Sequence, residues 1–220
     1  MTDATQYPLG RIYKPDSRDA DFPFSLHLSS LRTSALPSYK YWAAGPLKLN
    51  QKRTPSCVGQ TGANWLQATP IRTKISPNLG LELYLECKKI DGIPDIEGTW
   101  DRILMKILAA RGVVDRYLWA QNPEELSEWV LSTGPVMIGI PWYESMFTPN
   151  SKGLITEIKD DTGAGHEILI RGYNTKTKIY TLINSWGPNW GLNGEFKMKK
   201  EHVDRLVFAE NGDACAAVQK

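Results

Sequence analysis

The chain has 220 residues, of which 41% are hydrophobic and 23% charged, as is usual for a soluble globular protein. Its formal net charge is +2, and its lysines and arginines are interspersed with acidic residues. This gives no reason to expect a nucleic-acid partner. No run approaches the roughly 18 apolar residues that a membrane span needs, so no membrane partner is expected either.

The cysteines fit a reducing compartment or a protein that does not depend on disulfide bridges. Residues 1–8 have neither a basic cluster nor an apolar core, so we expect no signal peptide. The chain is therefore expected in the cytoplasm, or packaged and released with a phage if a virus encodes it. Cys57, Cys87 and Cys215 lie far apart without metal-binding spacing, so we expect no metal, no cofactor and no disulfide framework. A single Cys87–Cys215 bridge stays open, and the sequence gives no oligomeric state.

The first two parts of the chain differ in pattern. Residues 1–45 are rich in turn-forming residues and are expected to be an extended segment, with a short strand at 25–28. Residues 46–120 are expected to form a helical lobe. Its helices are predicted at 57–68, 79–90 and 99–110, where apolar residues recur at helical spacing.

Residues 121–220 are expected to form a β-rich lobe. They open with a helix from Asn122-Pro123 to near Gly134. The apolar period then changes to two, which predicts strands at 136–140, 166–173, 178–184 and 195–198. Helices followed by strands predict an α+β protein.

Cys57 begins a predicted helix, where the macrodipole and unpaired N–H groups favour a thiolate. Gln51, six residues earlier, could donate a second hydrogen bond to an oxyanion from its side-chain amide. Taken alone, the signal is weak, because a lone cysteine is usually a small buried hydrophobe.

His166 follows a glycine at the head of an apolar strand. It belongs to no zinc-protease motif, since Ile170 stands where a second histidine would be needed, and alone it would be read as structural. The run at 183–194, Ile-Asn-Ser-Trp-Gly-Pro-Asn-Trp-Gly-Leu-Asn-Gly, directly follows a strand. Without further context this run is a bulky aromatic turn.

This run resembles the N-S-W-G-x-x-W-G-x-x-G string of papain-like (C1) cysteine peptidases. Gln51 and His166 stand at the family's spacings from Cys57 and Asn184. Gly134-Pro135-Val136 is similar to a strand entry of the family, and residues 14–19 are similar to the lead-in of bacterial and phage-type members. The resemblance spans nearly the whole chain, most weakly at 1–45 and 200–220, and indicates a compact bacterial or phage-type member.

The resemblance implies a papain-like two-lobe fold, in which a helical lobe faces an antiparallel β-barrel-like lobe across a peptide-binding cleft. It implies a cysteine peptidase that hydrolyses peptide bonds through a thioester and takes a peptide or protein substrate. Cys57 would rest as a thiolate against protonated His166, and Asn184 would orient the imidazole beneath Trp186. Gln51 and the Cys57 N–H would hold the oxyanion.

Five residues are expected to bind substrate: Gly98, Thr99, Glu167, Trp186 and Trp190. Gly98 and Thr99 resemble the family's loop along which a substrate backbone lies. The family usually has a small residue where Glu167 stands. If that position lines the S2 pocket, its carboxylate would favour Arg or Lys at P2. Alternatively, Glu167 turns to solvent or pairs with a lysine.

Two other functions stay open. One is a cell-wall peptide hydrolase of phage or bacterial origin, and the other is a catalytically silent binding or structural protein on this fold. No inhibitory propeptide is recognisable before Cys57. Residues 1–45 could therefore regulate the site by packing along the cleft or by docking a partner, unless the enzyme is active as made.

Overall fold

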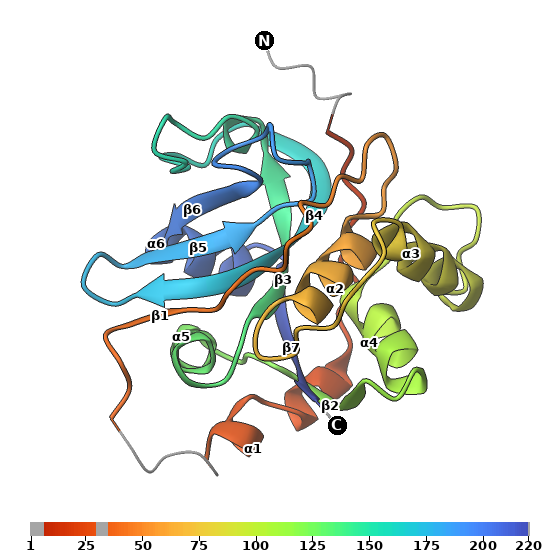
Figure 1. Ribbon diagram of the computed structural model, residues 1–220, viewed down its shortest axis with the longest axis horizontal. Helices are drawn as coiled ribbons and strands as arrows, with labels where there is room; N and C mark the ends of the chain where they lie inside the picture. The colour runs from red at the N-terminus through yellow and green to blue at the C-terminus, as the bar shows by residue number, and fades with distance from the viewer. Residues whose placement is uncertain (1–6, 30–34, 220) are drawn as a thin grey trace.

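The computed structural model describes residues 7–29 and 35–219 (Figure 1). Residues 1–6, on which much of the signal-peptide expectation depends, lie outside them. Within the described ranges no helix has the length and apolar character needed to cross a membrane. All three cysteines are buried and free.

Helices and strands alternate along the chain in a mixed order. The helices are η2 (Ser17–Asp21), α1 (Ser25–Leu28), α2 (Cys57–Gln67), α3 (Leu79–Ile90), α4 (Asp101–Ala110), α5 (Pro123–Ser132), η3 (Glu144–Met146), α6 (Lys200–Asp204) and the π-helical turn η4 (Arg205–Ala209). The strands are β1 (Tyr39–Tyr41), β2 (Val114–Trp119), β3 (Val136–Tyr143), β4 (Asp161–Asn174), β5 (Ile179–Ile183), β6 (Glu195–Lys199) and β7 (Asp213–Gln219).

The strands form one antiparallel sheet in the order β2-β7-β3-β4-β5-β6, and β1 pairs with β4. The sheet is open, with β2 and β6 at its edges, so the barrel-like lobe is not closed. Figure 1 shows α2, α3 and α4 together on one side of the molecule and β4, β5, β6 and α6 on the other. The expected α+β architecture is therefore present.

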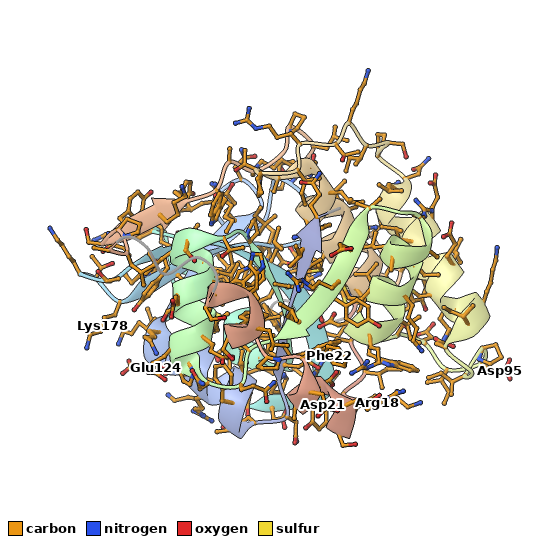
Figure 2. The ribbon with its side chains drawn as sticks, turned by 90° about the horizontal axis from the view of Figure 1, so that it is seen from below. Arg18, Asp21, Phe22, Asp95, Glu124 and Lys178 are labelled. Carbon is orange, nitrogen blue, oxygen red and sulfur yellow. The ribbon has the colours of Figure 1, made fainter. Side chains whose placement is uncertain are left out.

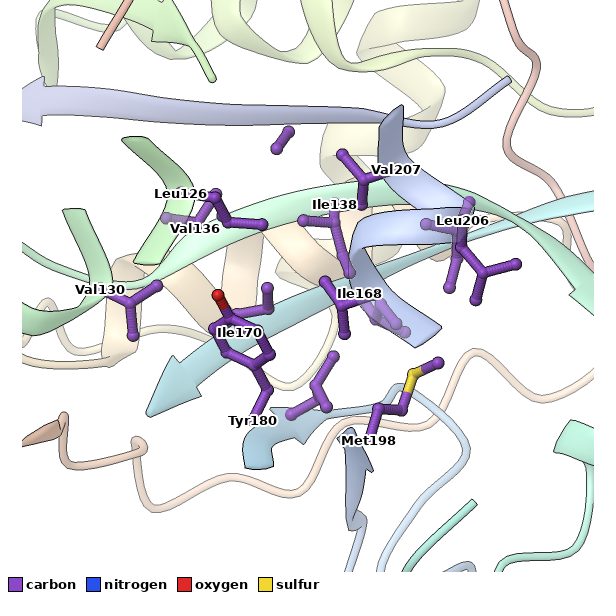
Figure 3. Packing of buried hydrophobic residues seen from close by; sticks show 14 of the residues in the cluster. Leu126, Val130, Val136, Ile138, Ile168, Ile170, Tyr180, Met198, Leu206 and Val207 are labelled. Carbon is purple, nitrogen blue, oxygen red and sulfur yellow. The ribbon is translucent and has the colours of Figure 1, made fainter. Parts of the chain in front are cut away.

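Both faces of the central strands are covered, which explains their continuous apolar runs. On β3 and β4, Met137 and Leu169 belong to the core beneath α2 and α4. Their neighbours Ile138 and Ile168 belong to the core on the opposite face, which Leu126 of α5 also joins (Figure 3).

The short strand expected at 25–28 was wrong, because this segment is the helix α1. Phe24 and Leu28 lie one helical turn apart and are both fully buried, and the Leu28 N–H donates to the Phe24 carbonyl. Apolar residues four apart favour a helix over a strand. Figure 2 shows Arg18, Asp21 and Phe22 near one another on the outer surface close to this segment.

Helix α2 is buried along its whole length and lies at the centre of the helical side. Its contact with α3 depends on glycine: a Cβ at Gly59 would lie 2.2 Å from the Gly80 carbonyl oxygen and 2.6 Å from the Tyr84 nitrogen. The close approach fixes the helix that begins with Cys57.

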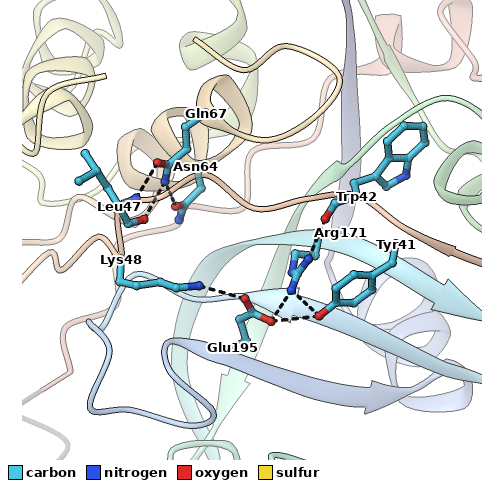
Figure 4. A network of polar contacts seen from close by, with 8 residues as sticks. All are labelled: Tyr41, Trp42, Leu47, Lys48, Asn64, Gln67, Arg171 and Glu195. Carbon is cyan, nitrogen blue, oxygen red and sulfur yellow. Dashed lines mark hydrogen bonds and ion pairs between the residues drawn. The ribbon is translucent and has the colours of Figure 1, made fainter. Parts of the chain in front are cut away.

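The chain that leads to α2 is tied to the sheet by a polar network (Figure 4). Glu195 of β6 accepts from Arg171 of β4 at 2.7 Å and from Lys48 at 3.0 Å. The Arg171 guanidinium also contacts the Tyr41 hydroxyl of β1. Although burial alone raises it, these two cations together lower the pKa of Glu195, so the carboxylate stays ionised.

Candidate active site

Cys57 is the first residue of α2 and is completely buried. Backbone N–H groups of Glu167, Gly10 and Val58 interact with its sulfur. These residues come from β4, from the N-terminal segment and from α2 itself, so the thiol lies where three parts of the chain meet.

His166 and Asn184 come from neighbouring strands, β4 and the end of β5. The His166 Nε2 lies 2.8 Å from the Asn184 Oδ1, and both residues are buried. The Trp186 ring stacks on the imidazole at 4.6 Å, and Trp142 meets it edge-on at 4.9 Å. The indole excludes water from the His–Asn hydrogen bond, as the resemblance implies.

The Gln51 side chain is held from three sides. Its Oε1 accepts from the Ser185 hydroxyl at 2.6 Å, which turns the Nε2 away from Ser185. The Nε2 donates to the Thr54 carbonyl and to the Pro8 carbonyl, both at 2.9 Å. Because Pro8 lies in the N-terminal segment, a peptide carbonyl oxygen already rests on the amide that was expected to hold an oxyanion.

Residues 7–12, here called the covering segment, cross the whole site. At one end the Tyr7 ring lies 4.8 Å from that of Trp186. At the other end the backbone N–H of Thr99 donates to the Gly10 carbonyl at 3.0 Å. The backbone carbonyl of Thr99 accepts from the Ile12 N–H at 2.8 Å. Between them, the Arg11 N–H donates to the Gly165 carbonyl at 3.0 Å. The segment thus binds to both sides of the site like an added strand.

The covering segment packs so closely beside Cys57 that neither Gly10 nor Gly98 has room for a side chain. A Cβ at Gly10 would lie 2.1 Å from the Pro55 carbonyl oxygen, and one at Gly98 would lie 2.5 Å from the Gly10 oxygen. Gly98 also has a φ of +91°, which disfavours any other residue. Gly98 and Thr99 lie against the backbone of this segment, and their expected role in binding a substrate backbone stays a prediction.

Burial changes the charge state that the resemblance implies. It raises the pKa of Cys57 to about 12, although backbone N–H groups favour the thiolate. It lowers the pKa of His166 to about 4, against the opposing effect of the Asn184 hydrogen bond. Near neutral pH the covered site therefore holds a thiol and a neutral imidazole, whereas a thiolate–imidazolium pair was expected.

The Arg11 side chain lies against the carboxyl groups of Asp101, Glu167 and Asp213, a cluster here called the carboxylate pocket. Oxygens of these three carboxyl groups lie within 4.8 Å of one another. The Arg11 Nη2 is 2.7 Å from the Asp213 Oδ2, and its Nη1 donates to the Asn211 carbonyl at 2.7 Å. Burial, with the neighbouring carboxylates next, raises the pKa of Glu167 and that of Asp101 well above their usual range.

Glu167 is fully buried, so the alternative in which it turns to solvent was wrong. Among the described residues, no lysine bonds to its carboxyl oxygens. Sequence reasoning missed its partners Arg11, Asp101 and Asp213. In the sequence, Asp101 is simply an acid near the start of the helix predicted at 99–110, and Asp213 lies in a stretch of small residues without clear alternation. No local pattern connects them.

Trp190 lies behind the site. Its indole meets Trp186 edge-on at 5.0 Å, and its Nε1 donates to the Phe147 carbonyl at 2.8 Å. It supports the ring that covers His166. Its expected contact with substrate stays a prediction.

Comparison with known proteins identifies the family of the chain. A family model described as papain family cysteine protease matches residues 105–214. Mouse cathepsin J is 34% identical over 222 residues, covering 83% of this chain and 66% of its own. A viral cathepsin of Adoxophyes honmai nucleopolyhedrovirus is 34% identical over 87 residues, 39% of this chain. That match spans only 25% of the viral protein.

Solved structures share the fold. Xylellain, a cysteine protease from Xylella fastidiosa, has a TM-score of 0.73 at 22% identity, covering 96% of this chain and 97% of its own. A cysteine protease that is a major ragweed pollen allergen, in its proform, has a TM-score of 0.72 at 16% identity and covers 99% of this chain. That match spans 77% of the allergen. The family model covers half of this chain, including the histidine and asparagine of the site. The chain belongs to the papain family of cysteine proteases.

Proposed function

We propose that the chain is a cysteine peptidase that hydrolyses peptide bonds through a thioester, and that the covered form described above is latent. One observation carries the proposal: the cleft holds a stretch of peptide whose Pro8 carbonyl oxygen accepts from Gln51. A site that binds peptide backbone beside a cysteine, a histidine and an oxyanion donor is suited to acyl transfer.

The chemistry follows from the positions of four groups. With substrate in place of the covering segment, the Cys57 sulfur attacks the peptide carbonyl carbon, and its proton passes to His166. Gln51 and the Cys57 N–H bind the oxygen that becomes negative. His166 then gives the proton to the leaving amine, which breaks the C–N bond and leaves a thioester.

The second half of the reaction hydrolyses the thioester and returns the enzyme to its starting state. His166 takes a proton from a water molecule, whose oxygen attacks the thioester carbon. The acid product leaves, and Cys57 regains its proton. Asn184 keeps the imidazole in one orientation throughout, because its Oδ1 holds the Nε2 of the ring.

The latent state follows from the same contacts. The covering segment occupies the oxyanion donor, the backbone of Thr99 and the surroundings of Cys57 together. A substrate cannot bind until it leaves. Arg11 contributes an ion pair in the carboxylate pocket, so replacing it should loosen the segment without changing a group that takes part in the chemistry.

Hydrolysis of a fluorogenic peptide library by the full-length Arg11→Ala chain tests the proposal. We expect turnover by this variant and at least tenfold less by the parent chain. Turnover should vanish when Cys57→Ala is added. A folded Arg11→Ala chain that cleaves no peptide in the library would contradict the proposed activity.

A further inference from the structure

The loop that follows α3, residues 91–98, is wrapped around one lysine side chain. Lys88 lies in the last turn of α3, and its side chain is 13% exposed. Its Nζ donates to three backbone carbonyl oxygens of the loop, those of Ile93 at 2.9 Å, Ile96 at 2.6 Å and Gly98 at 3.0 Å. An ammonium group has three N–H donors, so all of them are directed at the backbone of this loop.

The last of these carbonyls belongs to a peptide unit that reaches the cleft. The peptide bond between Gly98 and Thr99 is planar, so the Gly98 carbonyl and the Thr99 N–H point in opposite directions. The carbonyl is held by Lys88, and the N–H donates to the Gly10 carbonyl of the covering segment at 3.0 Å. Tyr84, one turn before Lys88 on the same face of α3, accepts from the Gly98 N–H at 3.2 Å. Helix α3 therefore holds both polar groups of Gly98.

We propose that Lys88 is a positioning residue for substrate binding, which fixes the direction of the Thr99 N–H in the cleft. It acts through the peptide unit between Gly98 and Thr99 and not by contact with the reacting groups. The inference rests on the proposed peptidase function, in which a substrate takes the place of the covering segment against Thr99.

The charge of Lys88 is what allows the three carbonyl groups to converge. Their oxygens carry partial negative charge, and a neutral side chain in the same place would leave them without donors. Hydrogen bonds from a charged donor are stronger than those from a neutral one. The Asp91 Oδ2 lies 2.8 Å from the Nζ, and its Oδ1 accepts from the Ile93 N–H at 3.0 Å. Asp91 thus fixes both the ammonium group and the start of the loop.

The rest of the loop has little to hold it in this conformation. Ile96 is 56% exposed, and Figure 2 shows Asp95 at the outer edge of the molecule. Gly92 and Gly98 have φ values of +78° and +91°, and glycine changes backbone conformation more readily than other residues. Without the ammonium group the carbonyls can turn to water, and the peptide unit that presents the Thr99 N–H can rotate with them.

Amide hydrogen exchange of the full-length parent chain, followed by NMR, tests the inference without catalysis. Lys88→Met keeps an unbranched side chain and removes its charge and donors. We expect the Thr99 and Ile12 N–H groups to exchange about tenfold faster, and by a larger factor than the Leu169 N–H in β4. Lys89→Met, which changes an exposed neighbour on the same helix, should leave these rates unchanged. Unchanged protection of Thr99, or equal acceleration at Leu169, would overturn the inference.

Steady-state hydrolysis of a fluorogenic peptide by the Arg11→Ala chain provides the second readout. Adding Lys88→Met should raise KM about tenfold and change kcat less than about twofold, because substrate backbone is held less firmly while the reacting groups are untouched. A merely structural role would lower kcat through loss of active protein and leave KM as it was. That result, or no change in either constant, would overturn the inference. If the Arg11→Ala chain cleaves no peptide, the proposed activity fails, whereas hydrogen exchange still decides the role of Lys88.

Discussion

Gln51 is the proposed oxyanion donor, and its side-chain amide is held at both ends. Its Oε1 is fixed by the Ser185 hydroxyl, so its Nε2 is presented to the carbonyl that enters the cleft. The Ser185 N–H in turn donates to the Asn184 Oδ1 at 2.7 Å. Ser185 thus positions both the proposed oxyanion donor and Asn184.

Replacing Gln51 by Ala in the Arg11→Ala background should lower kcat/KM by about 10²–10³-fold, because one oxyanion donor is lost. Steady-state hydrolysis of a fluorogenic peptide measures the effect. Gln121→Ala, which removes an exposed amide, is the control. A loss of about tenfold or less would show that the donor is another group.

His166 makes the covered form sensitive to acid. Burial lowers its pKa to about 4, whereas in an unfolded chain the pKa is near 6.5. The unfolded chain therefore takes up the proton first. The stabilisation is fully present above about pH 6.5, is lost progressively as the pH falls to about 4, and amounts to roughly 3 kcal/mol at most.

Urea unfolding of the parent chain between pH 7 and pH 4 should show this loss. The His166→Gln variant, which cannot titrate in that range, should show a smaller decrease in the free energy of unfolding. Equal pH dependence in the two proteins would mean that His166 is not buried in its neutral form.

At the scale of elements, the sequence predicted the two helices α2 and α3 nearly to the residue and located the apolar strands β3 to β6. It did so because glycine, proline and capping residues mark their ends. It did not predict β2 or β7. Their burial does not alternate strictly, and β7 is rich in alanine, so no period of two stands out.

The candidate catalytic groups were found through a resemblance, since each alone had a structural explanation. The covering segment and the partners of Glu167 could not be found. They depend on strand pairing and on chain crossings between residues far apart in sequence, such as Arg11 with Asp213. Composition and periodicity report on neighbours along the chain, and these contacts are between distant parts of it.

The contact between α2 and α3 gives a prediction for an element. Gly59→Ala places a methyl group against backbone atoms of Gly80 and Tyr84, which cannot move without shifting α3. We expect a loss of about 2–3 kcal/mol in the free energy of unfolding, measured in urea. Gly134→Ala is the control, because the nearest atom to its Cβ would be 3.7 Å away. A loss below about 0.5 kcal/mol at Gly59 would contradict the close helix contact.

At the scale of the whole molecule, the covering segment connects the helical side with the sheet side. It binds Thr99 beside the helices and Gly165 on β4, and its arginine neutralises part of the carboxylate pocket between them. The segment that covers Cys57 therefore also places its arginine against these carboxyl groups. Displacement of the segment would uncover Cys57 and these carboxyl groups together.

The most direct test is the intact mass of the protein after exposure to an epoxide peptidase inhibitor at about pH 5.5, where an ordinary thiol is almost wholly protonated. The samples are the parent chain, Arg11→Ala, and Arg11→Ala with His166→Ala. Gly10→Ala, which displaces the segment but leaves the pocket unchanged, is a second way to uncover the site. We predict a single adduct on Cys57 in the uncovered chains, at least tenfold slower labelling of the parent, and no adduct without His166. Equal labelling of the parent and uncovered chains would contradict latency, and a folded, uncovered chain without an adduct would contradict the peptidase site itself.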